Sequence, residues 1–278
     1  MTVGRTETDR EVPTSQGVDG SFGETGQDGA EAKRNHEPPF FYVESAVLSA
    51  AHREDWTRDE LLVYLLHCRG YNEKLRCSLM GEQAVRIRLG LTKKPWEQAQ
   101  ASLELRGRLS TETGKGSKRP RICIAGAGET YSGAAQTGER PKAIDGHRYQ
   151  DVASKPLVKA PWTLIDGSTD GSAPSLADLR SRDAILLLLA IYGFARADGV
   201  IPLREVWVVE REGAGVGVGF STAAQADFLG DPMCLESAAA ELLDSGLLYT
   251  GVEGAGGKWV VHLAHPMAPG PSAARAVA

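Results

Sequence analysis

The pattern of apolar and polar positions predicts two short helices in succession within the first half of the chain. Apolar residues recur at helical spacing over residues 81–89, and Gly90 follows where a glycine commonly supplies the left-handed residue that ends a helix. After a tight turn, Thr92 is suited to cap a second helix, which extends to Gly107. The apolar residues that share one face of this second helix are Trp96, Ala99 and Leu103.

A basic hairpin is predicted directly after the second helix. Residues 109–113 have strand-like composition, residues 114–120 are rich in turn formers, and Ile122 and Ile124 alternate with polar or small neighbours. The cations at the tip of this hairpin are Lys115, Lys118 and Arg119. The segment therefore ends in a positively charged loop.

Two earlier stretches of the first half also have clear patterns. Thr57 and Glu60 have the spacing of a capping box ahead of an apolar run, which predicts a supporting helix to about Arg69. Residues 75–79 then predict a short strand.

The second half of the chain repeats part of this pattern. Residues 182–194 are apolar on all sides and long enough for three turns of helix. An insertion at about residues 204–220 contains alternating glycines, and a helix over 232–245 and a hairpin over 249–263 are predicted after it. Leucine, glycine and leucine recur with one spacing in both halves, at Leu103, Gly107 and Leu109 and again at Leu242, Gly246 and Leu248.

At these residues the first half resembles the winged helix-turn-helix family, in which a leucine, a glycine and an apolar residue at this spacing lead from the recognition helix into the wing. The resemblance covers about one fold unit and implies that strand 75–79 pairs with the wing. With the repeat, we expect a mainly α fold with small β-hairpin wings (α+β), as two winged-helix units joined by a flexible linker. The expected divisions are an acidic disordered tail over 1–37, a DNA-binding domain over 38–125, a linker over 126–165, a second winged-helix-like association domain over 166–265 and a frayed tail over 266–278.

The net charge of −5 is divided unevenly along the chain. Residues 1–37 hold 4 Lys and Arg against 8 Asp and Glu, residues 38–165 hold 20 against 14, and residues 166–278 hold 7 against 14. The segment with the predicted helix pair and hairpin is therefore the positive one, which favours contact with a polyanion there.

Several features of the sequence bear on where the protein works. No apolar run approaches the ~20 residues needed to cross a bilayer, and the N-terminus lacks the apolar core of a signal peptide. The four cysteines have no CxxC spacing and look like reduced packing residues. We expect a cytoplasmic, nucleoid-associated protein without a membrane partner.

An α-helix fits the major groove of B-DNA and contacts base edges with the side chains opposite its core face. For the helix over 92–107, Gln98 is suited to a bidentate contact with adenine, Lys93 or Lys94 to guanine or phosphate, and Ala101 to a thymine methyl group. The remaining candidates, suited to phosphate contacts or to the start of the recognition helix, are Arg86, Arg88, Thr92, Lys115, Lys118 and Arg119.

Three functions follow as hypotheses. The first is sequence-specific binding of double-stranded DNA by a transcription regulator that uses the helix over 92–107 and the wing over 109–124. The second is a plasmid-type replication initiator, and the third is a winged-helix interaction subunit of a chromosome-organising complex. No catalytic, metal-binding or cofactor-binding pattern is present, so we expect a protein that is not an enzyme. The apolar run over 182–194 predicts a homodimer held through residues 166–265.

Overall fold

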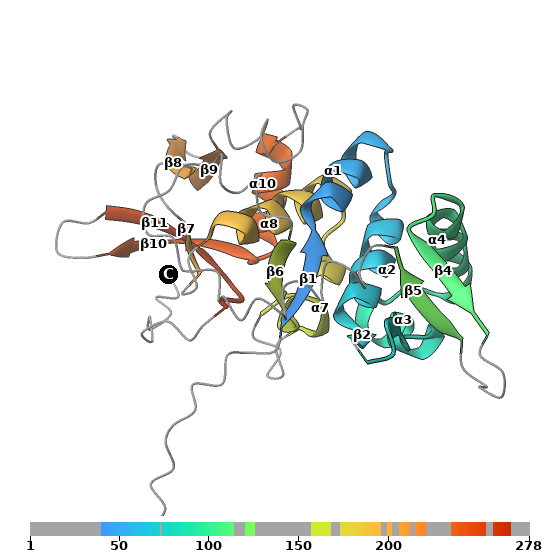
Figure 1. The fold of residues 1–278 in the computed structure, drawn as a ribbon. Helices are drawn as coiled ribbons and strands as arrows, with labels where there is room; N and C mark the ends of the chain where they lie inside the picture. The colour runs from blue at the N-terminus through green and yellow to red at the C-terminus, as the bar shows by residue number, and fades with distance from the viewer. Residues whose placement is uncertain are drawn as a thin grey trace, which may run out of the picture. The chain divides into compact units, whose positions relative to one another are not determined.

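The computed structural model of the chain consists of helices and small antiparallel sheets (Figure 1). In the part of the chain that it describes, no helix is both long and apolar enough to span a membrane. The described residues are 40–72, 74–113, 120–125, 157–167, 173–195, 199–201, 206–211, 215–220, 235–253 and 258–267.

The first half begins with a strand and continues through four helices to a hairpin. Its elements are β1 (Phe40–Glu44), α1 (Ser45–Arg53), α2 (Arg58–Arg69), β2 (Tyr71–Asn72), β3 (Cys77–Ser78), α3 (Glu82–Leu89), α4 (Lys93–Leu105), β4 (Leu109–Glu112) and β5 (Arg121–Ile124). Strands β2 to β5 form one sheet in the order β2-β3-β5-β4, in which Ser78 of β3 pairs with Ile122 of β5. The short strand predicted for residues 75–79 is confirmed as β3 and does pair with the hairpin.

The residues predicted to start and end the helices of the first half are found at those helix ends. The Thr57 side chain accepts the N–H of Glu60 (3.2 Å) and the Glu60 carboxylate accepts the N–H of Thr57 (2.5 Å), which completes a capping box at the start of α2. Gly90 ends α3 with φ of 65°, the left-handed conformation that glycine adopts without strain. Thr92 is the N-cap residue of α4, although its side chain makes no capping hydrogen bond.

The second half also begins with a strand and ends with a helix followed by a hairpin. It comprises β6 (Leu157–Pro161), α7 (Thr163–Asp166), the 3₁₀ turn η1 (Leu176–Asp178), α8 (Arg182–Phe194), β7 (Val200–Ile201), β8 (Val206–Arg211), β9 (Gly215–Phe220), α10 (Leu235–Asp244), β10 (Leu248–Glu253) and β11 (Lys258–Leu263). Its three-stranded sheet has the order β10-β11-β7, while β8 and β9 pair separately as a hairpin within the insertion.

The two halves match in detail where a helix leads into a hairpin. In each sheet the last strand lies between the strand before it and the short early strand, in the orders β4-β5-β3 and β10-β11-β7. The backbone bonds that turn the chain out of α4 recur after α10 at a constant separation along the chain. The matching N–H to carbonyl pairs are Gly107 to Glu104 and Gly246 to Leu243, and Ala125 to Arg108 and Ala264 to Leu247. The second half is thus a structural repeat of the first in these elements.

Among the contacts that join the halves are a pairing of strands and a reciprocal pair of arginine contacts. Strand β1 pairs with β6 (Figure 1). The pairing is antiparallel, and Tyr42 lies opposite Lys159. Helices α2 and α8 both start with a hydroxyl residue, an arginine and an aspartate, and each arginine reaches the segment just before the other helix. Arg58 donates to the carbonyls of Leu179 (Nε, 2.5 Å) and Ala177 (Nη2, 2.6 Å). Arg182 donates to the Asp55 carboxylate and to the carbonyl of Trp56 (3.3 Å).

The buried apolar side chains of both halves belong to one continuous core. Every described side chain of α8 from Ala184 to Tyr192 is buried within this single chain, where α8 packs against α10, β6, α1 and α2. The apolar surface that motivated a homodimer through residues 166–265 is therefore covered internally. Residues 157–165, which were expected to belong to a linker, form β6 and most of α7 because Val158, Ala160, Leu164 and Ile165 are buried in that core.

Candidate nucleic-acid interface

One face of helix α4 packs against the core. Ala99 and Leu103 are buried, Trp96 is partly buried beside them, and the helix packs against α2. These are the three residues that the apolar spacing predicts for the inner face. Their burial fixes the rotation of α4 about its axis, and so decides which side chains face outward.

The C-terminal end of α4 is held by a Schellman motif. The N–H of Arg108 donates to the carbonyl of Leu103 (2.9 Å) and the N–H of Gly107 donates to the carbonyl of Glu104 (2.9 Å). Gly107 has φ of 67°, which a side chain would strain. The motif turns the chain directly into β4, so the hairpin begins beside the end of the helix.

The outward face of α4 carries a straight row of four exposed residues. They are spaced four, three and four positions apart, which places them in line along a helix. The row consists of Lys94, Gln98, Ala101 and Leu105. It lies opposite the buried Ala99 and Leu103. The sequence analysis named the first three residues and missed Leu105, although continuing the same spacing by one turn finds it.

Two more predicted residues stand at the start of α4 and one on α3. Thr92 and Lys93 are exposed, and Lys93 Nζ lies 3.8 Å from Glu97 Oε1 one turn further along. That pair is too exposed to lock the lysine in place, since exposed pairs of this kind contribute only about 0.3–0.5 kcal/mol. Arg86 is exposed on α3. All three remain accessible from outside.

Arg88 is engaged within the protein. Its Nε donates to Asp166 Oδ1 (2.6 Å), and the same carboxylate receives Arg69 Nη2 (2.5 Å). The Arg69 guanidinium also lies 4.2 Å from the ring centre of Trp162, a cation–π contact. Arg88 thus helps to tie α2 and α3 to α7, and the expected role in phosphate contact does not fit its position.

Side-chain hydrogen bonds fix α4 to the first strand of the hairpin. Gln100 Nε2 donates to Glu104 Oε1 (3.2 Å) and to Thr111 Oγ1 (3.1 Å), and the Thr111 hydroxyl donates to Glu104. This network occupies the flank of α4 beside the exposed row. It gives helix and hairpin one fixed relative orientation, which a rigid recognition surface requires.

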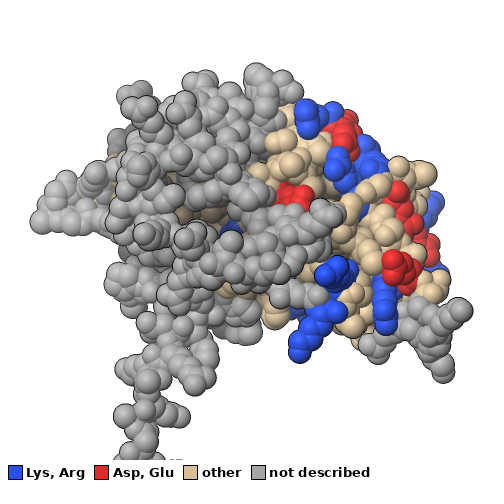
Figure 2. Space-filling model, in the orientation of Figure 1, with Lys and Arg blue, Asp and Glu red and all other residues tan. Residues whose placement is uncertain are grey.

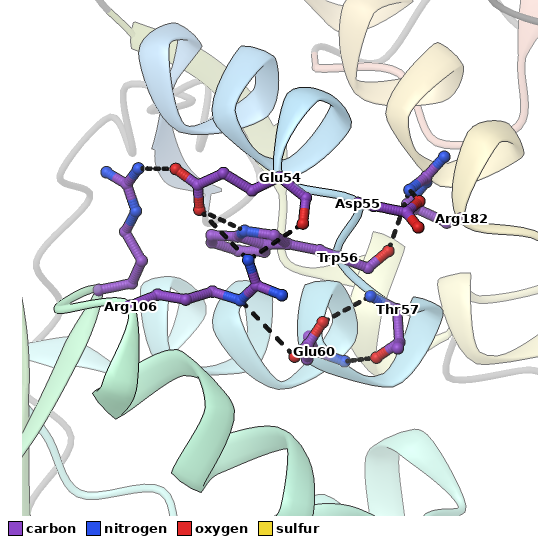
Figure 3. A network of polar contacts seen from close by, with 8 residues as sticks. Glu54, Asp55, Trp56, Thr57, Glu60, Arg106 and Arg182 are labelled. Carbon is purple, nitrogen blue, oxygen red and sulfur yellow. Dashed lines mark hydrogen bonds and ion pairs between the residues drawn. The ribbon is translucent and has the colours of Figure 1, made fainter.

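A second polar network anchors the end of α4 to the turn between α1 and α2 (Figure 3). Glu54 accepts the Trp56 indole N–H (3.0 Å) and Arg108 Nη2 (2.6 Å), while Arg106 Nη1 donates to the Glu54 carbonyl (3.0 Å). The hydrogen bond from Trp56 and the nearby guanidinium groups lower the pKa of Glu54 against the opposing effect of burial. Arg106 and Arg108 are therefore structural cations.

The equivalent row on α10 has a different charge. At the separation that relates Gly107 to Gly246, Gln98, Ala101 and Leu105 correspond to the exposed Ser237, Ala240 and Asp244, and α10 contains neither Lys nor Arg. On the face drawn in Figure 2, Lys and Arg side chains alternate with Asp and Glu rather than forming one unbroken basic patch. The two cations of α4, Lys93 and Lys94, correspond in the sequence to Pro232 and Met233, which lie outside the described residues.

Three predicted residues, Lys115, Lys118 and Arg119, belong to the sequence between β4 and β5 and lie outside the described residues. Within the described ranges, no group of three or more His, Cys, Asp or Glu side chains is placed to hold a metal ion. The candidate interface is therefore defined by α4, Arg86 on α3 and the two strands of the hairpin.

Comparison of the chain with protein-family models, with curated proteins and with solved structures finds no match.

Proposed function

We propose that the protein is a sequence-specific double-stranded DNA-binding protein that acts as a transcription regulator. In this proposal α4 is a recognition helix, the β4–β5 hairpin is its wing, and the two halves are tandem winged-helix units. Support comes from the order α2, β3, α3, α4, β4, β5 and from the sheet order β3-β5-β4, which resemble the arrangement of a winged helix-turn-helix unit.

The observation that carries the proposal is the exposed row on α4 opposite its buried face. A helix that lies in the major groove presents such a row to the base edges. Gln98 is suited to a bidentate contact with adenine and Lys94 to the acceptor atoms of guanine, while Ala101 fits against a thymine methyl group. These side chains are exposed, and the helix that holds them is fixed at its C-terminal end.

Contacts with phosphate would come from around the row. Thr92 and Lys93 are exposed at the start of α4, where backbone N–H groups and the helix dipole also favour an anion, and Arg86 is exposed on α3. The cations of the hairpin tip, Lys115, Lys118 and Arg119, remain part of the proposal. Arg88 does not, because Asp166 already holds it.

The second half has a supporting role in this proposal. With Glu236 and Asp244 exposed on α10 and no cation on that helix, placing it against phosphates would bring like charges together. The proposal no longer includes a homodimer through residues 166–265, since α8 is covered by its own chain.

The test is selection of duplexes from a random-sequence library by the full chain, followed by binding measurements across a range of salt concentrations. We expect one enriched motif and an affinity that falls steeply with salt, because phosphate neutralisation releases counterions. Gln98→Ala should relax the preference at one or two base pairs, at a cost of about 1–3 kcal/mol of discrimination. Lys94→Glu should weaken binding to the selected duplex strongly.

Two matched controls accompany this test. Ser237→Ala changes the residue of α10 that corresponds to Gln98, and Lys74→Glu reverses an exposed charge in the turn between β2 and β3. Both should leave affinity and motif unchanged. Failure of the folded protein to retain any duplex at low salt would end the proposal.

A further inference from the structure

Leu105 is an exposed apolar residue at the C-terminal end of α4. Its relative exposure is 90%, against 68% for Ile87 and 56% for Val252, the next two among the exposed large apolar side chains of the described residues. Burying a leucine side chain contributes roughly 1.5–3 kcal/mol of favourable free energy. The protein alone does not gain this free energy from Leu105, because the side chain stays in water. A partner that covers Leu105 would gain this free energy on binding.

The surroundings of Leu105 point to the class of that partner. The same row carries Lys94 and Gln98, and Lys93 precedes Lys94 at the start of the helix. A surface with cations at one end, an amide in the middle and apolar side chains at the other complements an anionic partner with polar edges and scattered apolar groups. The major groove of DNA has this character, and its apolar group is the 5-methyl of thymine.

We propose that Leu105 and Ala101 together contact thymine methyl groups, and that the protein therefore selects A·T pairs where the end of α4 meets the duplex. This inference rests on the proposed DNA-binding function and adds a specificity-determining residue to it. The two residues are four positions apart, about 6 Å along the helix axis. Since base pairs are spaced about 3.4 Å apart, the two methyl groups belong to thymines about two steps apart.

The experiment uses the full chain and the duplex selected above, with each thymine replaced in turn by deoxyuridine. This replacement removes the 5-methyl group and leaves base pairing unchanged. For the wild-type protein we expect about a three- to fivefold loss of affinity at each of two positions, the loss for burying one methyl group fewer. Leu105→Ala should bind the thymine duplex more weakly and lose its response at one of the two positions.

Ile87→Ala is the matched control, because it shortens another exposed apolar side chain on the neighbouring helix. It should keep both responses to deoxyuridine. Thermal unfolding should be almost the same for Leu105→Ala and wild type, since the side chain has little packing to lose. A changed thermal midpoint would show that Leu105 is packed, and would overturn the inference.

The remaining outcomes separate the inference from the function it rests on. If the wild-type protein binds the selected duplex but responds to no deoxyuridine replacement, the inference is overturned and the proposed function stands. An equal loss by Leu105→Ala on thymine and deoxyuridine duplexes would also overturn it, since Leu105 would then contact something other than the methyl group. If no duplex is bound at all, the proposed function fails first.

Discussion

At the scale of single residues, His67 on α2 is fully buried beside β3. Its Nδ1 lies 3.2 Å from Ser78 Oγ, and its Nε2 has no hydrogen-bond partner in the described part of the chain. Loss of hydration disfavours the charged imidazolium and lowers the pKa of His67 to about 4. The folded protein thus keeps this side chain neutral over a range in which the unfolded chain takes up a proton.

That difference predicts a pH-dependent stability. An unfolded histidine has a pKa near 6.5, so the unfolded state binds the proton first as the pH falls. The stability from neutral His67 is fully present above about pH 6.5 and declines as the pH approaches 4, by about 3 kcal/mol in total. Urea unfolding at several pH values should show this decline in the wild type and a smaller one in His67→Leu. Equal declines in both proteins would contradict it.

Residue positions that depend on local periodicity could be predicted from the sequence. The burial of Ala99 and Leu103 and the exposure of Gln98 and Ala101 follow from helical spacing. The ion pair of Arg88 with Asp166 could not be predicted, because the two residues are far apart in the sequence. Neither segment has a pattern that points to the other. Long-range pairing of charges requires the fold.

At the scale of elements, Gly107 and Gly246 end the two corresponding helices with φ of 67° and 76°. A Cβ added at either position would meet no other atom within 4 Å, so backbone strain is the main cost of a side chain there. The two sites therefore form a matched pair for measuring that strain.

We expect Gly107→Ala and Gly246→Ala each to lower the free energy of unfolding by about 1 kcal/mol. Asparagine tolerates the left-handed conformation better, so Gly107→Asn and Gly246→Asn should cost less than the alanine variants. Chemical denaturation of the four variants measures this directly. If asparagine proves no better than alanine at both sites, backbone strain is not the cause.

Helices and hairpins whose signals lie within one stretch of sequence were largely predictable. The helix that starts at the Thr57 capping box and the α4–β4–β5 succession are confirmed. Strand β1 and its partner β6 were not predicted as a pair, because more than a hundred residues separate them and neither is part of a hairpin. The sequence of a short apolar strand does not indicate which other strand it pairs with.

At the scale of the whole molecule, the reciprocal arginine contacts predict how strongly the halves depend on each other. Arg58 satisfies two carbonyls, whereas Arg182 reaches one carbonyl and Asp55, whose side chain is 91% exposed and so contributes little. Arg58→Ala should therefore lower the free energy of unfolding by about 2 kcal/mol and Arg182→Ala by about half as much.

Denaturant unfolding followed by near- and far-ultraviolet circular dichroism checks this order. Arg53→Ala, which removes an exposed arginine from the end of α1, should change the stability by less than about 0.5 kcal/mol. A larger effect of Arg182→Ala than of Arg58→Ala would show that the exposed ion pair matters more than the two carbonyls.

The antiparallel pairing of β1 with β6 also has a consequence for synthesis on the ribosome. Strand β1 opens the described part of the first half, yet its partner ends at Pro161, well after the β4–β5 hairpin has left the ribosome. Until then Phe41 and Val43 lack the strand that lies beside them in the finished protein. A nascent chain thus completes the fold of its first half only after the second half has begun to emerge, which delays a finished first half until both halves are being made.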